Sequence, residues 1–134
     1  MSAPPDDKPR ILVVDDELSV RVLLTSILSR AGYVVSTYEN AESALAELAA
    51  QQPQLVIVDR VLPGMDGIDF FRLARAQLPK LQGILISGYP SEGIMARALD
   101  AGLKEYVVKP FQVSDVLTVC EAVMKMAPSS TPGE

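Results

Sequence analysis

The sequence contains no histidine and a single cysteine, Cys120, and these two shortages narrow the chemistry open to it. Without an imidazole, the chain has no histidine general base, no Ser-His-Asp triad and no His-ligated zinc. One cysteine cannot form an internal disulfide, so we expect a protein of the reducing cytoplasm. The glycine motifs of Walker A and dinucleotide-binding sites are also missing, which argues against a nucleotide ligand.

Long apolar runs are absent too, although 49% of the 134 residues are hydrophobic. No stretch approaches the length of a membrane span, and Asp6 and Asp7 stand where a signal peptide needs apolar residues. The net charge of -5 argues against direct binding to nucleic acid or to an anionic membrane. We expect one domain over residues 9–126, between disordered tails at 1–8 and 127–134 that are rich in proline and polar residues.

What the sequence does contain is a regular alternation of short apolar runs and helix-length segments. This pattern predicts five βα units that form a parallel sheet. Strands are expected over residues 11–14, 33–38, 55–58, 82–86 and 105–108. Helices are expected between residues 16 and 33 and over 41–51, 66–78, 91–101 and 113–126. Gly32 would end the first helix, and Pro63-Gly64 would break the chain after the third strand.

Polar side chains end four of these predicted strands. Asp15 and Asp16 follow the first strand, Asp59 the third, Ser87 the fourth and Lys109 the fifth. Ligands of open parallel sheets bind outside the carboxyl ends of the strands, so we expect these side chains to share one rim. Carboxylates crowded in this way either share protons or hold a hard cation that prefers oxygen.

This set of side chains suits phosphoryl transfer. A carboxylate attacks phosphorus when a metal ion and cationic groups neutralise the phosphoryl oxygens, and the reaction needs mostly positioning. The acids could hold Mg²⁺, while the lysine and the hydroxyl could bind phosphoryl oxygens. One aspartate at a strand end means little, because loops are polar, but five such residues at matching strand ends are a far more specific signal.

The segments that carry these residues resemble the receiver domain of two-component response regulators. They are LVVDDE (12–17), VDRVLPGMDG (58–67), ISGYP (86–90) and YVVKPF (106–111), in order over nearly the whole chain. The resemblance implies a flavodoxin-like α/β fold, with a doubly wound five-stranded parallel sheet in strand order 2-1-3-4-5 and five helices. It also implies a stand-alone phosphorylation-dependent signalling switch. Its phosphodonor would be a sensor histidine kinase or a phosphotransfer protein.

The resemblance implies a role for each residue of the rim. Asp59 matches the phosphoacceptor. Asp15 and Asp16 match the acidic pair that holds Mg²⁺, with Asp59 and the backbone carbonyl of Val61 as the remaining protein ligands. Apart from its own Mg²⁺-dependent phosphorylation and dephosphorylation, the chain is expected to have no enzymatic activity.

The other matches concern the response to the phosphoryl group. Ser87 matches the switch hydroxyl that follows this group, and Lys109 matches the lysine that pairs with one of its oxygens. Tyr106 matches the aromatic residue that swings inward when the hydroxyl moves. Pro110 matches a proline that follows a cis peptide bond.

Two other functions are compatible with an acidic rim of this kind. One is a phosphatase or phosphotransferase of the haloacid-dehalogenase type, which usually carries a second aspartate two residues after its nucleophile. Val61 occupies that position here and counts against it. The other is a receiver-like module that works without phosphate, which would be expected to lose a site residue, and none is lost. The phosphorylation switch is therefore the favoured prediction.

The resemblance also implies an output surface on the fourth helix, the fifth strand and the fifth helix. Val119 and Met126, with Tyr106 and Leu103, could form an apolar patch there for a partner or a symmetric dimer, although scattered apolar residues are an equal alternative. We expect a monomer or a weak dimer, and an output supplied by a separate protein unless the chain is a fragment of a longer one. We also expect a long-lived phosphorylated state.

Overall fold

Five strands form one parallel sheet in the computed structural model, which describes residues 8–125. The strands are β1 (Arg10–Val14), β2 (Val34–Tyr38), β3 (Leu55–Asp59), β6 (Gln82–Ser87) and β7 (Glu105–Val108). Their order across the sheet is β2-β1-β3-β6-β7, and each neighbouring pair is parallel. The predicted doubly wound fold is confirmed, because this is the order 2-1-3-4-5 once a small separate hairpin is set aside.

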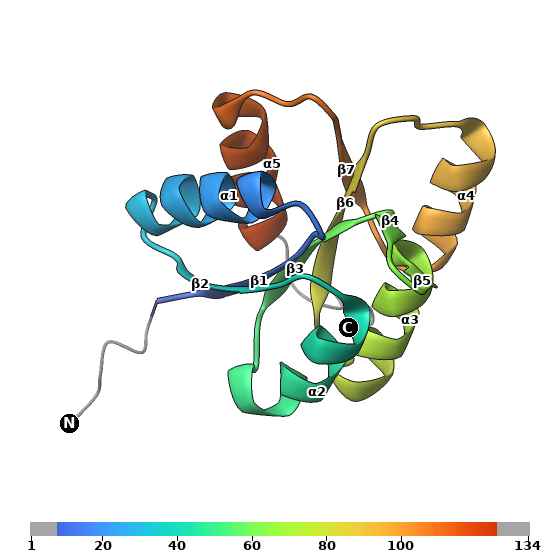
Figure 1. Cartoon of the computed structure of the whole chain (residues 1–134), viewed down its shortest axis with the longest axis horizontal. Coiled ribbons are helices and arrows are strands. Elements are labelled where there is room, and N and C mark those ends of the chain that lie inside the picture. The colour runs from blue at the N-terminus through green and yellow to red at the C-terminus, as the bar shows by residue number, and fades with distance from the viewer. Residues whose placement is uncertain (1–7, 126–134) are drawn as a thin grey trace.

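Helices cover both faces of the sheet (Figure 1). They are α1 (Leu18–Arg30), α2 (Ala41–Gln51), α3 (Gly67–Gln77), α4 (Glu92–Asp100) and α5 (Val113–Lys125). Buried side chains of α1 and α5 belong to one core cluster, and those of α2, α3 and α4 belong to the other. The sheet therefore has a separate apolar core on each side, as its continuous runs of valine, isoleucine and leucine predict.

Strand β1 shows how one apolar run serves both cores. Leu12 and Val14 point into the core under α2, α3 and α4, while Ile11 and Val13 point into the core under α1 and α5. All four are at most 1% exposed. Side chains alternate between the two faces along a strand, so a strand covered on both faces needs apolar residues at every position.

Local side chains fix where the helices begin. Asn40 accepts a hydrogen bond from the amide of Ser43 at 2.8 Å before α2, and Ser91 accepts one from the amide of Ile94 at 3.2 Å before α4. Such caps satisfy amides that have no partner inside the helix. Gly32 follows α1 with a φ of 101°, a left-handed conformation that glycine adopts without strain.

A two-stranded hairpin lies between β3 and α3 that the sequence pattern did not predict. Its strands are β4 (Val61–Leu62) and β5 (Met65–Asp66), which pair antiparallel around Pro63-Gly64. Gly64 has a φ of 76°, so the expected chain break is a tight turn of this hairpin. Immediately after it, the amide of Gly67 donates a 2.6 Å hydrogen bond to the carbonyl of Arg60, which closes the segment on itself.

Two leucines lie differently from the prediction. The helical spacing of apolar residues on α1 predicts that Leu23 faces the core beside Leu24 and Leu28, but 41% of its surface is exposed, and only Leu24 and Leu28 of that helix are fully buried. Leu103 was expected in an exposed patch, but it is 2% exposed and belongs to the core under α4. It lies against Gly83 together with Phe71, in space that a side chain at position 83 would occupy.

The rest of the expected patch is less exposed than predicted. Val119 and Tyr106 are only partly exposed and pack against the cores. Met126 lies outside the described residues, as do the predicted tails apart from Lys8, which is exposed. Over residues 8–125, no helix has the length and apolar character that crossing a membrane requires.

Candidate functional site

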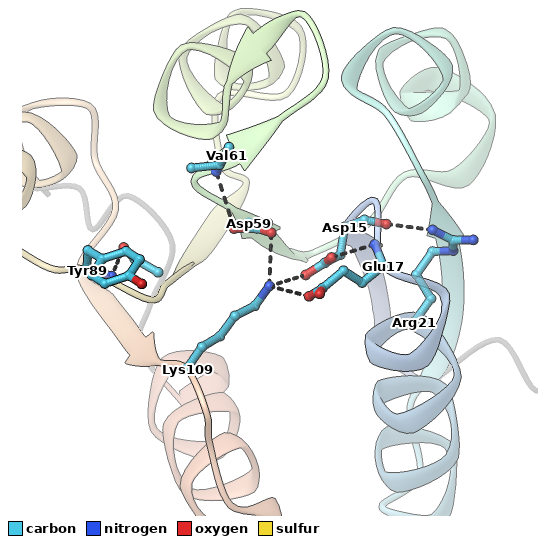
Figure 2. A network of polar contacts seen from close by, with 8 residues as sticks. Asp15, Glu17, Arg21, Asp59, Val61, Tyr89 and Lys109 are labelled. Atoms are coloured by element: carbon cyan, nitrogen blue, oxygen red, sulfur yellow. Dashed lines mark hydrogen bonds and ion pairs between the residues drawn. The ribbon is translucent and has the colours of Figure 1, made fainter.

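Four neighbouring strands bring polar side chains to the carboxyl edge of the sheet (Figure 2). Asp15 follows β1, Asp59 ends β3, Ser87 ends β6, and Lys109 follows β7. From β1 the chain adds β2 on one side of the sheet, and it then adds β3, β6 and β7 on the other side. This change of side between β1 and β3 is the switch point where doubly wound sheets bind their ligands. The predicted rim therefore lies at the place on the sheet that the topology favours.

Lys109 is the centre of this rim. Its Nζ lies 2.9 Å from Glu17 Oε1, 3.0 Å from Asp59 Oδ2 and 3.3 Å from Asp15 Oδ2. Burial lowers the pKa of Lys109, but hydrogen bonds to Glu17 and Asp59 and the charges of Asp15 and Asp59 raise it by more, so the pKa lies well above its ordinary value. These contacts therefore favour the charged form of the lysine. The peptide bond between Lys109 and Pro110 is cis.

Asp15 is the most buried acid of the site, with 0% exposure. Its Oδ1 accepts a hydrogen bond from the amide of Glu17 at 2.9 Å. Within the described part of the chain, its Oδ2 has no hydrogen-bond partner, only the ion-pair contact with Lys109. Burial is the main cause that raises the pKa of Asp15, and the charge of Asp59 adds to it. The carboxylate is thus a buried acceptor with one oxygen left for a further partner.

Asp59 presents its carboxylate between two donors. Strand β3 is buried along its whole length, and Asp59 at its end is 7% exposed. The amide of Val61 donates to Asp59 Oδ1 at 3.2 Å, and Lys109 donates to Oδ2. Each oxygen of Asp59 therefore has a donor that fixes its direction.

Ser87 and Tyr106 line a cavity of about 200 Å³ between β6, β7 and α4. Ser87 is buried, and its Oγ accepts a hydrogen bond from the amide of Tyr89 at 3.2 Å. Tyr106 is partly exposed and lies beside Leu85 in the pairing of β6 with β7. The predicted switch residues therefore share one cavity, next to the rim.

The donors of the rim fit a hard cation. Among residues 8–125, carboxylate oxygens of Asp15, Glu17 and Asp59 lie within 4.8 Å of one another. The unpaired Oδ2 of buried Asp15 is the kind of atom that a metal ion would satisfy, and an all-oxygen donor set suits Mg²⁺. Asp16 is exposed and lies outside this group, while Val61 directs its amide toward Asp59.

Glu17 and Arg21 belong to the site although the sequence pattern did not identify them. Glu17 contacts Lys109, and Arg21 donates from Nη1 to the carbonyl of Asp15 at 2.8 Å while facing Glu39 at 3.8 Å. Arg21 thereby ties the loop after β1 to the loop after β2. The available signal for Glu17 was its place in the run Asp-Asp-Glu; for Arg21 there was none, because its partner is a backbone carbonyl.

The fold and the rim together define a class, that of small doubly wound α/β domains with an acidic, lysine-containing site at the carboxyl edge of the sheet. Within this class the chain belongs to the response regulator receiver domain family, whose model matches residues 11–121. Membership gives the chain a role in two-component signalling, and the expected resemblance is confirmed.

Known proteins agree with this assignment. The chain is similar to the alkaline phosphatase synthesis transcriptional regulatory protein PhoP of Bacillus subtilis, with 32% identity over 92% of this chain and 51% of that protein. It is 35% identical to the C4-dicarboxylate transport transcriptional regulatory protein DctD of Rhizobium meliloti, over 77% of this chain and 22% of that protein. The chain thus spans about half or less of these two relatives.

Solved structures of similar shape include the chemotaxis protein CheY4 of Vibrio cholerae. The two chains superpose with a TM-score of 0.83 at 26% identity, over 87% of this chain and 98% of that chain. NtrX of Brucella abortus is 33% identical with a TM-score of 0.82, over 88% of this chain and 27% of that chain. These likenesses extend over almost all of the described residues.

Proposed function

We propose that this chain is a phosphorylation-dependent signalling switch and that Asp59 is its phosphoacceptor. The phosphodonor is a phosphohistidine on a sensor kinase or a phosphotransfer protein. A carboxylate oxygen of Asp59 attacks phosphorus, the phosphorus–nitrogen bond breaks, and its electron pair returns to the imidazole nitrogen of the donor. The observation that carries this proposal is the contact of Lys109 with Asp59 and Asp15 at 3.0 and 3.3 Å, which places a cation beside the attacking oxygen.

The rim residues have separate tasks in this proposal. Lys109 pairs with one phosphoryl oxygen and Ser87 donates its hydroxyl to another, while the amide of Val61 holds the carboxylate in place. Asp15, Asp16, Asp59 and the carbonyl of Val61 would hold Mg²⁺. When bound, the ion would neutralise charge on the phosphoryl oxygens. The unpaired oxygen of Asp15 supports this assignment.

Phosphorylation would change the surface formed by α4, β7 and α5. Movement of Ser87 toward the phosphoryl group frees space in the cavity that it shares with Tyr106, and Tyr106 turns into that space. The cavity of about 200 Å³ supports this step, because it already lies between the two side chains. A separate output protein then reads the altered surface. We place the protein in the cytoplasm, where a free buried thiol such as Cys120 persists.

The phosphodonor would dock over a groove of about 600 Å³ beside the rim. Val20 and Leu23 of α1, Tyr89, and the segment from Lys109 to Phe111 contribute to its lining. Phosphorus must come within bonding distance of Asp59, so the donor has to cover this neighbourhood. The exposed side chain of Leu23 would then contact the donor protein. Leu23→Glu should slow phosphoryl transfer from a phosphorylated kinase, while the rate of phosphorylation by small phosphodonors should stay the same.

Phosphorylation by acetyl phosphate tests the proposed function. With Mg²⁺, intact mass spectrometry should find one added phosphoryl group, and excess chelator should prevent its addition. Asp59→Asn should abolish it, while Asp100→Asn, at a site with a 78% exposed side chain on α4, should leave it unchanged. Normal labelling of Asp59→Asn would sink the assignment. The chain should turn over no substrate beyond its own phosphorylation and dephosphorylation.

A further inference from the structure

The side chain of Glu17 is directed to the site instead of to its own helix. Glu17 is the N-cap residue of α1, with extended backbone angles, but its side chain makes no capping hydrogen bond. Its carboxylate instead meets Lys109 Nζ at 2.9 Å, the shortest of the three contacts of that ammonium (Figure 2). A capping hydrogen bond ordinarily stabilises a helix. Helix α1 lacks that hydrogen bond from Glu17, because the carboxylate of Glu17 contacts Lys109 instead.

Lys109 is surrounded by carboxylates in this arrangement. Its Nζ donates hydrogen bonds to Glu17 and Asp59 and forms an ion pair with Asp15 at 3.3 Å. Because Glu17 holds one of the three N–H donors of the ammonium, a phosphoryl oxygen on Asp59 competes with it for the same cation. Asp15 and Asp59 have side chains that are 0% and 10% exposed, whereas Glu17 is 57% exposed and can turn into water. Glu17 is thus the partner that Lys109 can lose at least cost.

We propose that Glu17 restrains phosphorylation by competing with the phosphoryl group for Lys109. In the unphosphorylated chain, Glu17 holds the ammonium; once Asp59 carries a phosphoryl group, Lys109 pairs with its oxygen and Glu17 is released to solvent. The proposal rests on the proposed function of Asp59 and deepens it. Glu17 is a positioning residue, since it acts through Lys109.

Two substitutions of Glu17 separate this competition from a simple effect of charge. Glu17→Gln keeps the size of the side chain and removes the charge, while Glu17→Asp keeps the charge and withdraws it from Lys109 by one methylene. Glu121→Gln, at an exposed glutamate in the second half of α5, is the matched control. For each chain, the initial rate of phosphorylation by acetyl phosphate is measured with Mg²⁺, together with the affinity for beryllofluoride, an anion that mimics the phosphoryl group.

We expect Glu17→Gln to raise both the initial rate and the beryllofluoride affinity about fivefold, the scale of one nearby unit charge in a solvated site. Glu17→Asp should raise both by a smaller factor, and Glu121→Gln should change neither. A Glu17→Asp chain that behaves as the native one would show that charge alone acts, and would overturn the competition. A Glu17→Gln chain that is no faster than the native one would overturn it as well.

Magnesium affinity, measured by calorimetry without phosphodonor, provides the remaining check. Loss of a charge this close to Asp15 and Asp59 should lower this affinity in Glu17→Gln by about fivefold at most, and saturating Mg²⁺ in the rate measurements removes that effect. A large loss would instead identify Glu17 as a metal ligand and would contradict the proposal. If the native chain takes up no phosphoryl group at all, the function proposed for Asp59 fails; if the native chain is phosphorylated and Glu17→Gln is no faster, only the role of Glu17 falls.

Discussion

At the scale of single residues, the site holds side chains in states that cost stability. Asp15 is fully buried, and one of its oxygens lacks a hydrogen-bond donor in the described part of the chain. Burial raises the pKa of this carboxyl, because the fold disfavours its charged form. This carboxylate faces the Lys109 ammonium, and its Oδ2 can still accept a further partner such as a metal cation. Stability is commonly lowered in this way at functional sites.

We therefore expect Asp15→Asn to stabilise the chain in Mg²⁺-free buffer at pH 7, by about 1 kcal/mol of unfolding free energy. The amide oxygen can still accept from Glu17, and the buried charge is gone. Because the raised pKa marks destabilisation that is present above the folded pKa and relieved below it, the gain should shrink in acid. Urea unfolding with chelator measures it. A less stable variant would contradict the argument.

Added Mg²⁺ should make the native chain more stable than the Asp15→Asn variant, the reverse of the order expected without it. An ion that binds only the folded state raises the free energy of unfolding in proportion to the logarithm of its concentration. The native chain should gain from added Mg²⁺, and Asp15→Asn should gain much less. Asp100→Asn serves as the control, since its exposed side chain on α4 should leave both the stability and the Mg²⁺ response within about 0.5 kcal/mol of native.

Val61 should control how long the phosphoryl group survives. Hydrolysis needs a water aligned with phosphorus, and valine, 60% exposed beside Asp59, offers it no hydrogen bond. Tyr89 stands two residues after Ser87, as Val61 does after Asp59, but it is 84% exposed and is drawn apart from Asp59 in Figure 2. We expect Val61→Asn to speed loss of phosphate roughly tenfold through better positioning of water, and Tyr89→Ala to have little effect. Time courses of dephosphorylation decide; equal rates for the native chain and Val61→Asn would refute the idea.

The sequence predicts those site residues that stand at the ends of strands. It does not predict those whose placement depends on a turn. Asp15, Asp59, Ser87 and Lys109 each stand at the end of an apolar run, and parallel strands bring such positions to one edge. The direction of Glu17 depends on Lys109, which lies 92 residues away in sequence. No local pattern encodes which of two adjacent acids in a turn faces a distant lysine.

At the scale of elements, α3 begins where its backbone crosses the end of β3. A Cβ built on Gly67 would overlap the carbonyl oxygen of Asp59 and approach the backbone of Arg60 within 2.9 Å. Neither neighbour is a flexible side chain that could move aside. The first residue of α3 and the end of β3 therefore pack backbone to backbone, and only glycine permits this approach.

Gly67→Ala should accordingly cost about 2–3 kcal/mol of stability, the scale of an overpacked site whose neighbours cannot yield. It should also slow phosphorylation, since relief of the overlap displaces Asp59. Gly93→Ala, in α4 and with open space around the new Cβ, should instead stabilise by up to about 1 kcal/mol. Chemical unfolding of both chains provides the comparison. Equal stability of the two variants would show that the contact between α3 and β3 is not tight.

Element boundaries followed from local chemistry wherever a cap or a buried run was present. Helix α2 spans the predicted residues 41–51, and β7 spans the predicted 105–108. The hairpin of β4 and β5 escaped prediction because strands of two residues are too short to show alternation. Leu103, in the loop before β7, could not be placed either, since it packs against Gly83 of β6, which is distant in sequence.

At the scale of the whole molecule, the charged groups of the site lie at the edge of the sheet, while the single cysteine lies in an apolar core. Cys120 lies in the core under α1 and α5 with 0% exposure, and burial raises the pKa of its thiol to about 12. The thiolate is the reactive form, so a folded chain should hold this cysteine unreactive.

A thiol reagent at pH 8 should therefore modify Cys120 only as fast as the chain opens. The rate should rise steeply in urea, at the concentrations that unfold the protein, and should fall when Mg²⁺ stabilises the native chain. Colour release from an aromatic disulfide reagent measures this directly. Rapid modification in native buffer would contradict the burial of the thiol.

The closed segment between β3 and α3 also gives the molecule a spectroscopic indicator of its own state. The amide of Gly67 makes a 2.6 Å hydrogen bond to the carbonyl of Arg60, the residue next to Asp59. The shielding of an amide proton depends on the length of its hydrogen bond, so we expect this proton to resonate downfield of most amides and to shift when the bond changes length. A single glycine resonance thus becomes a readout of events at the neighbouring carboxylate, without any attached label.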